Sequence, residues 1–290
     1  MIKTLIGLLR PHQWTKNLFC FAGIVFGTHL LTRDNFVNAA LVFAGFCCAS
    51  SATYVLNDIR DVELDRAHPK KRERSIASGR ISVLAAAIVG WGLVLASGFL
   101  VWLSGWLPTT CLLLYFGLNV AYSLGLKHLV VVDVFSIALG FIFRLLAGIY
   151  ALRDIPTGWI MLCTLFLALF LGFAKRRSEL SDLTGERPSQ RPVLSKYRIE
   201  YLDSLVNSTA TMTILSYALF TLTSGKNPTL VVTVPIVCYA IMRYKLLVMV
   251  RAGAQEPERL LVLDPGIQLS VVAWLVAFLV ITYGNIHLFR

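Results

Sequence analysis

Nine apolar segments, separated by short polar connections, make up most of the chain. They cover residues 17–32, 36–56, 83–104, 107–124, 129–151, 156–174, 204–223, 229–249 and 266–287. A helix needs about 20 residues to cross the hydrocarbon layer of a membrane. Only helices and closed barrels satisfy the backbone there, and these segments lack the alternation of a membrane barrel. The pattern predicts an all-α polytopic membrane protein with about nine transmembrane helices and a single domain, 1–290.

Composition agrees with a membrane protein. Hydrophobic residues make up 57% of the chain and charged residues 15%, against about 45–50% and about 25% in soluble domains. All six cysteines lie in apolar segments without a CxxC pair, so we expect them to be buried apolar side chains. The five histidines are scattered, and no zinc or haem site is predicted.

Lysine and arginine are concentrated in alternate connections. Of the 27 Lys and Arg, Arg144 lies inside an apolar segment, and only Arg33, Arg153, Lys226 and Arg290 lie on the side opposite to the N-terminus, counting nine spans. The positive-inside rule therefore predicts a multi-pass protein of the inner (plasma) membrane with a cytoplasmic N-terminus. The same bias explains the net charge of +11 by topology and attraction to anionic lipids, so no nucleic-acid partner is predicted.

Four carboxylates gather just after the second apolar segment, in YVLNDIRDVELDR (54–66). On a helix, residues three and four apart share a face, so Asp58, Asp61 and Asp65 should stand together, with Asn57 beside Asp61. Carboxylates on one face repel one another unless they bind a shared cation. Oxygen ligands without His or Cys favour Mg²⁺, which keeps open positions for diphosphate oxygens.

A plainer interpretation of the same stretch is a solvated helix end. Arg60 and Arg66 would then pair with the acids at the surface, where Glu63 is expected in either case. The location counts against this interpretation, because carboxylates without a role are costly where a span leaves the membrane. The basic run KKRER that follows, residues 70–74, could hold phosphates that a metal leaves uncovered.

A second polar cluster, AKRRSEL (174–180), follows the sixth segment on the same side of the membrane. The two clusters could therefore converge over one cavity. Asp133 and Arg144 lie within the fifth segment, where a charge is a functional candidate. Eleven residues of helix span roughly 16 Å, so these two side chains cannot touch within one helix, and each needs a partner on another span or a ligand.

The motif N-D-x-x-D-x-x-x-D after the second predicted helix resembles that of the UbiA superfamily of intramembrane transferases. The resemblance extends over LLRPHQWTKNLF (8–19), residues 54–82, AYSLGLKHLVVVDV (121–134) and AKRRSEL. It implies helices around a cytoplasm-facing cavity that binds a substrate diphosphate with Mg²⁺ as cofactor. The stretches are most similar to the decaprenyl-phosphate phosphoribosyltransferase branch.

One departure bears on the substrate. Aromatic prenyltransferases of the superfamily carry a second motif, D-x-x-x-D, after the sixth helix, where this chain reads KRRSELSDL (175–183). A basic cluster suits a substrate that carries more phosphate groups than a prenyl diphosphate does. The branch implies 5-phosphoribosyl diphosphate as donor and a polyprenyl phosphate as acceptor. The acceptor is already anionic, so no general base is needed. The resemblance also implies a homo-oligomer, with a trimer as the expected form.

The resemblance assigns roles to particular residues. Asp58 and Asp61 are the expected catalytic residues, and the expected metal ligands are Asn57, Asp58, Asp61 and Asp65. The expected substrate-binding residues are Lys16, Asn17, Asn57, Asp65, Arg60, Lys70, Arg72, Arg74, Tyr122, Lys127, Arg144, Lys175 and Arg176.

Two other functions stay open at this point. One is a prenyltransferase that joins a prenyl group from a prenyl diphosphate to an aromatic acceptor, against which the missing second aspartate motif counts. The other is a transporter or lipid-binding protein that uses the acids as a cation site. A transporter would more often show inverted repeats and broken helices near the middle of the membrane.

Overall fold

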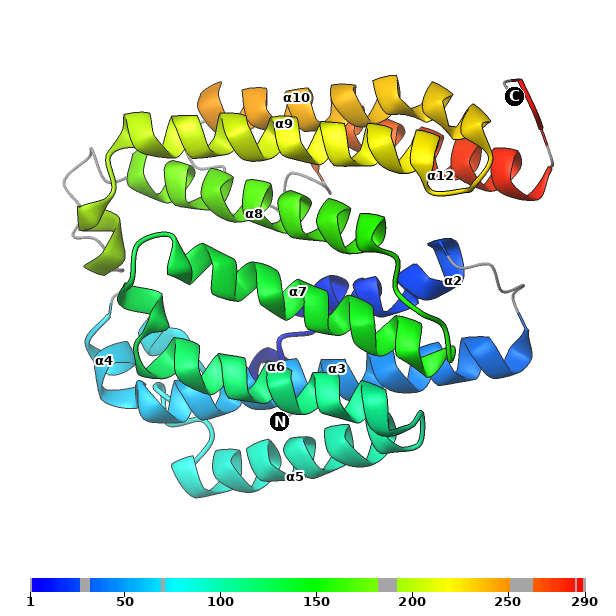
Figure 1. Ribbon diagram of the computed structural model, residues 1–290. Coiled ribbons are helices and arrows are strands. Elements are labelled where there is room, and N and C mark those ends of the chain that lie inside the picture. Colours follow the sequence, from blue (N-terminus) through cyan, green and yellow to red (C-terminus); the bar gives the residue numbers. More distant parts are fainter. Residues whose placement is uncertain are drawn as a thin grey trace. The chain divides into compact units, whose positions relative to one another are not determined.

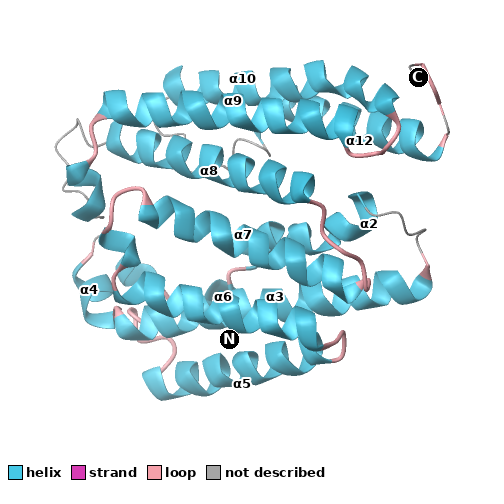
Figure 2. Ribbon diagram, viewed as in Figure 1, coloured by secondary structure: helices cyan, strands magenta, loops and turns pink. Residues whose placement is uncertain are grey.

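The computed structural model describes residues 2–26, 32–68, 71–181, 192–250, 263–284 and 286–288. Helices and loops make up all of these described residues, as Figure 2 shows, and the predicted all-α class is confirmed. The chain divides into two compact units, one of Met1–Gly125 and Gly140–Pro156, the other of Leu126–Leu139 and Thr157–Arg290. Lys70 and Asp182 lie outside the described residues.

Eight helices in the described residues are long and apolar enough to cross a membrane. They correspond to eight of the nine predicted segments. In Figure 1 they are α3 (Arg33–Arg60), α5 (Val83–Trp102), α6 (Trp106–Leu124), α7 (Val132–Ala151), α8 (Gly158–Ser181), α9 (Ile199–Thr223), α10 (Val234–Val250) and α12 (Pro265–Tyr283).

The first predicted segment differs from a regular span. A 3₁₀ helix η1 (Pro11–Phe21) leads into a short helix α2 (Ala22–Phe26), and residues 27–31 are not described. The prediction of a ninth long helix is therefore not confirmed. A 3₁₀ run of 11 residues is unusually long and marks a segment whose shape is set by its neighbours.

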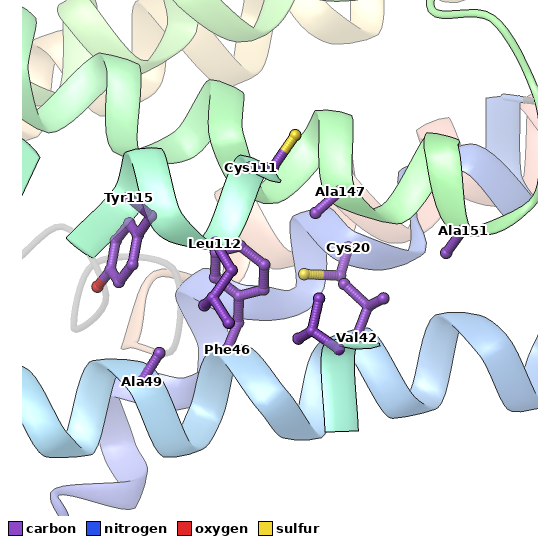
Figure 3. Packing of buried hydrophobic residues seen from close by; sticks show 10 residues of the cluster. Cys20, Val42, Phe46, Ala49, Cys111, Leu112, Tyr115, Ala147 and Ala151 are labelled. Carbon is purple, nitrogen blue, oxygen red and sulfur yellow. The ribbon is translucent and has the colours of Figure 1, made fainter. Parts of the chain in front are cut away.

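Helix α3 is the centre of the first unit. It packs along α5 and also contacts η1, α6 and α1 (Ile2–Leu9). Figure 3 shows the core formed by residues of η1, α3, α5, α6 and the C-terminal part of α7, in which the ring centroids of Phe46 and Tyr115 lie 5.4 Å apart. This core fixes η1 against α3, and with it the polar ends of both elements.

Glycine allows η1 to approach α7 closely. A Cβ on Gly148 would lie 2.0 Å from the carbonyl oxygen of Cys20. The backbone cannot move away cheaply, so this contact requires a residue without a side chain. It explains how a 3₁₀ segment is held deep in the first unit.

In the second unit, α9 packs against α8 and α10, and α10 packs against α12. Asp264 caps α12 by accepting a hydrogen bond from the Ile267 amide at 3.0 Å. The same carboxylate pairs with Arg243 of α10 at 3.0 Å. The hydrogen bond from Arg243 holds the pKa of Asp264 below its usual range.

Candidate active site

The acidic stretch is not one continuous helix. Helix α3 ends at Arg60, Asp61 takes φ −96° and ψ 13°, and the short helix α4 (Val62–Ala67) follows. The expectation that Asp58, Asp61 and Asp65 stand on one face assumed an unbroken helix, and that assumption is wrong. The predicted ligands form two groups, Asp58 with Asp65 and Asn57 with Asp61.

In the first group Arg74 joins Asp58 and Asp65, and Arg10 binds Asp58 as well. Arg10 Nη2 donates to both oxygens of Asp58 at 2.7 Å. Arg74 Nη1 donates to Asp58 Oδ1 at 3.0 Å and to Asp65 Oδ2 at 2.7 Å. Both carboxylates are buried, while the guanidinium groups are partly exposed. These charge-assisted bonds neutralise two carboxylates that would otherwise repel.

The second group surrounds the end of α6. Asn57 Oδ1 accepts a hydrogen bond from Ser123 Oγ at 3.1 Å. Arg60 donates to Asp61 Oδ1 at 3.0 Å and to the Ser123 carbonyl at 3.1 Å. Glu63 is exposed and pairs with Arg66, as expected of a solvated acid. The surface-pairing interpretation therefore describes Asp61 and Glu63, but not the buried Asp58 and Asp65.

A cavity of about 440 Å³ opens beside Asp58. Its lining comes from α1, the start of η1, the end of α3 and the segment after α4. The lining residues are Thr4, Gly7, Leu8, Arg10, His12, Asp58, Glu73, Arg74, Ser75 and Arg80. The cavity belongs entirely to the first unit and lies within the size range of small-molecule sites.

Arg10 reaches Asp58 from a constrained backbone position. It precedes Pro11 and has φ 52° and ψ 59°, in the left-handed region. A residue before proline is disfavoured in the α region, and a non-glycine residue at positive φ stores strain. The Arg10 guanidinium also lies 4.8 Å from the ring centroid of Tyr54. Ser51 of α3 tethers this turn, because its hydroxyl donates to the Leu9 carbonyl at 2.7 Å.

Arg10 was missed from the sequence, although it lies in the 8–19 stretch. In that stretch the sequence indicated Lys16 and Asn17. Arg10 could have been found from the need of buried carboxylates for counter-charges. Arg80, His12 and Ser75 were missed as well, since their sequence neighbours carry no distinguishing pattern.

Arg144 and Asn17 form a buried polar group in the first unit. Arg144 Nε donates to Asn17 Oδ1 at 2.7 Å, and its other nitrogens donate to the Tyr115 hydroxyl at 3.0 Å and the Gly140 carbonyl at 2.8 Å. The prediction that Arg144 needs a partner from another element is confirmed. Asn17 is completely buried and also bonds to Ser50 of α3, so its amide ties η1, α3 and α7 together.

Arg176 lies in a buried ion network of the second unit. Its Nε donates to Asp133 Oδ2 at 2.6 Å and its Nη1 to Glu179 at 2.8 Å. Tyr197 donates to the other Asp133 oxygen at 3.0 Å and accepts from the Val131 amide, which has an unusual φ of 71°. Burial raises the pKa of Tyr197 above its usual range, so its hydroxyl stays protonated and can donate.

The other predicted substrate contacts fall in both units. Lys16 Nζ donates to Gln13 Oε1 at 2.5 Å, and Arg72 is exposed on the 3₁₀ turn η2 (Lys71–Glu73). Tyr122 lies on the last turn of α6, Lys127 on η3 (Leu126–His128), and Lys175 on the last two turns of α8. Helix α8 thus continues through residues that were expected to follow it.

The residues of the acidic stretch fit a hard divalent cation in their chemistry, since they offer carboxylate and amide oxygens only. Their arrangement fits less well. Across the described ranges, no group of three or more His, Cys, Asp or Glu side chains is placed to hold a metal ion. Asp58 and Asp65, which Arg74 already joins, are the pair best placed to share a cation.

Known proteins are similar to this chain over most of its length. The UbiA prenyltransferase family matches residues 17–263. A protein of Mycolicibacterium smegmatis named decaprenyl-phosphate phosphoribosyltransferase is 32% identical over 95% of this chain and 91% of its own length. Its namesake from Corynebacterium glutamicum is 30% identical over 96% and 86%.

A solved structure agrees with these sequence matches. A UbiA homolog from Archaeoglobus fulgidus, bound to GPP and Mg²⁺, superposes with a TM-score of 0.72 at 20% identity and covers 95% of this chain and 99% of that one. At that identity the likeness concerns the fold. Together with the length of the sequence match, it establishes that the chain is a membrane transferase of the UbiA prenyltransferase family.

Proposed function

We propose that this protein transfers the 5-phosphoribosyl group of 5-phosphoribosyl diphosphate to a polyprenyl phosphate and releases diphosphate. The observation that carries the proposal is the cavity beside Asp58, which three arginines border. Such a lining suits a donor that carries a phosphomonoester in addition to its diphosphate. Support also comes from relatives named decaprenyl-phosphate phosphoribosyltransferase, which are similar over nearly the whole chain.

The reaction breaks the bond between the anomeric carbon and the diphosphate oxygen. Mg²⁺, when bound, would neutralise charge that develops on the leaving diphosphate. Asp58 and Asp65 would hold it, with Asn57 and Asp61 as further oxygen donors. Arg10 and Arg74 would then be released in part from the carboxylates and become available to phosphate oxygens. Both roles are electrostatic and positional.

The acceptor oxygen attacks the anomeric carbon as an anion. It needs no base from the protein, which agrees with a cavity lined by arginines and carboxylates. We place the reaction at the cytoplasmic face of the plasma membrane, following the distribution of Lys and Arg. A homo-oligomer, with a trimer as the expected form, stays a prediction for this chain.

The test is a transfer assay on the purified protein with two substrate pairs. Labelled 5-phosphoribosyl diphosphate and polyprenyl phosphate should give a lipid-extractable product with Mg²⁺, and none after chelation. Asp58→Asn should reduce the rate at least about 100-fold, because a main electrostatic contact at the leaving group is lost. Glu63→Gln, a surface acid in the same stretch, is the matched control and should leave the rate unchanged.

The alternative is a prenyltransferase that uses an aromatic acceptor, which the match to the UbiA prenyltransferase family keeps open. The second substrate pair is therefore geranyl diphosphate and 4-hydroxybenzoate. Product from this pair alone would refute phosphoribosyl transfer. Product from neither pair, with folded protein and added Mg²⁺, would refute both transferase proposals.

A further inference from the structure

The cavity beside Asp58 has more hydrogen-bond donors than its carboxylates use. Arg10 binds Asp58 through Nη2 alone, and Arg74 binds Asp58 and Asp65 through Nη1 alone. Within the described part of the chain, the remaining guanidinium nitrogens of both residues make no hydrogen bond. Each arginine can therefore hold its carboxylate and still donate to a second oxyanion.

Arg80 adds a third cation at the cavity. It is exposed, and it has no hydrogen bond or ion pair among the described residues. Asp58 and the exposed Glu73 are the acids of the lining. Three guanidinium groups thus face two carboxylates, and one of those carboxylates already accepts three hydrogen bonds. The lining keeps a net positive charge and planar donor forks, which match phosphate oxygens.

The rest of the lining indicates a water-soluble ligand. Leu8 is the one large aliphatic residue among the lining residues. Ser75 and Thr4 add hydroxyl groups, and Ser75 Oγ donates to the Thr4 carbonyl at 3.1 Å. An isoprenoid chain would gain little from such a surface, whereas a phosphorylated sugar would find donors for both its phosphate and its hydroxyl groups.

We propose that the cavity bordered by Arg10, Arg74 and Arg80 binds the phosphomonoester of a phosphorylated sugar. This inference rests on the proposed function, under which the group is the 5-phosphate of the donor. Arg10 and Arg74 then link the subsite to the reacting end, because the same guanidinium groups hold Asp58. A prenyl diphosphate has no phosphomonoester apart from its diphosphate, so it cannot fill this subsite. The three arginines would therefore determine donor specificity.

The test measures binding to the full-length protein in detergent, without Mg²⁺, by calorimetry. Ribose 5-phosphate should bind, and ribose should not. Arg80→Gln should weaken this binding about 10-fold or more, because it removes a charge-assisted contact to phosphate. Arg80 has no ion pair to lose, so this variant should fold. Arg66→Gln, which removes an exposed cation next to Glu63 and away from the cavity, is the matched control.

Arg10→Lys is the second variant, because lysine keeps the charge beside Asp58 but loses the planar fork. It should fold and bind ribose 5-phosphate more weakly. If a short-chain prenyl phosphate binds in place of ribose 5-phosphate, and Arg80→Gln weakens that binding, the cavity serves the lipid phosphate and the inference is wrong. Equal affinities in Arg80→Gln and Arg66→Gln would also overturn it.

These outcomes can be separated from a failure of the proposed function. If ribose 5-phosphate binds as predicted but no phosphoribosyl product forms, the subsite stands and the function fails. If product forms and Arg80→Gln leaves the KM for 5-phosphoribosyl diphosphate unchanged, the function stands and the subsite fails.

Discussion

We predict that Arg176 stabilises the second unit and does not bind a substrate. Its removal should lower the free energy of unfolding and leave the affinity for each substrate nearly unchanged. The sequence placed it among the phosphate contacts. In the structure its side chain is 1% exposed, and Asp133, which is 0% exposed, accepts its Nε hydrogen bond at 2.6 Å. Arg176→Gln would leave the Asp133 carboxylate buried without its guanidinium, while the Tyr197 hydroxyl still donates to it.

The size of the effect follows from that burial. Removing one member of a buried ion pair costs about 3–5 kcal/mol, because the other charge stays desolvated. For a unit of this size, that corresponds to a fall in melting temperature of about 6–20 °C. Asp133→Asn should cost less, since Glu179 also accepts from Arg176. The double variant should recover about 1–3 kcal/mol relative to the sum of the single variants.

The assay is thermal unfolding of the purified variants. Size-exclusion chromatography then identifies the folded fraction, and the kinetics are measured on that fraction. Arg177→Gln is the comparator on the same helix turn. Its pair with Asp203 is partly exposed and should contribute about 1 kcal/mol or less. Its hydrogen bond to the Val248 carbonyl should add about 0.5–1.5 kcal/mol, so the total stays below the loss expected for Arg176→Gln. An Arg176→Gln protein with unchanged melting temperature and a 10-fold higher KM for one phosphate substrate would refute this reasoning. Arg176 would then be a ligand contact.

Three further predictions concern packing, pH and topology. Gly148→Ala should destabilise the protein by about 1–3 kcal/mol or more, since its Cβ would meet the carbonyl of η1, whereas Gly92→Ala on α5 meets open space and should be neutral in thermal unfolding. Asp264→Asn keeps the cap but loses the guanidinium pair. Because the folded pKa of Asp264 is lowered from 3.8, the stability difference from wild type should persist above about pH 4 and vanish as pH falls through the folded pKa. In a cysteine-free background, a cysteine at Ser78 should react with a membrane-impermeant thiol reagent from the cytoplasmic side and one at Lys226 from the opposite side; reversed labelling would overturn the predicted orientation.

Eight long helices were predictable because each is an apolar run of nearly the right length, bounded by polar residues. Their ends were less predictable. Helix α8 continues to Ser181, so residues that were expected to follow the sixth span are helical instead. Lys and Arg at a span end mark where the membrane ends, but they do not stop a helix, since both residues have good helix propensity.

The 3₁₀ segment and the break at Asp61 were not predictable from local pattern. Residues 17–32 are apolar enough for a span, and nothing in LNDIRDVELD signals a helix end, since it lacks Gly and Pro. Both features depend on contacts distant in sequence. The η1 segment is shaped by α3 and by the close approach of Gly148. Arg74 binds Asp58 and Asp65, which lie on opposite sides of the break, while Arg60 binds Asp61 at the break itself.

The arginines differ in whether a carboxylate compensates their charge, and this distinguishes structural from ligand-binding roles better than their place in the sequence does. Arg176 donates to two carboxylates, so its charge is compensated within the protein. Arg144 donates to an amide, a phenol and a peptide carbonyl, with no carboxylate contact among the described residues. The partly exposed Arg10 and Arg74 share their carboxylates and keep spare donors toward a cavity. A phosphate competes poorly for Arg176, because binding there would leave Asp133 buried and unpaired. We therefore expect the phosphate site at the cavity beside Asp58 and not at the end of α8. A phosphate bound at this cavity would leave every buried carboxylate with at least one guanidinium partner.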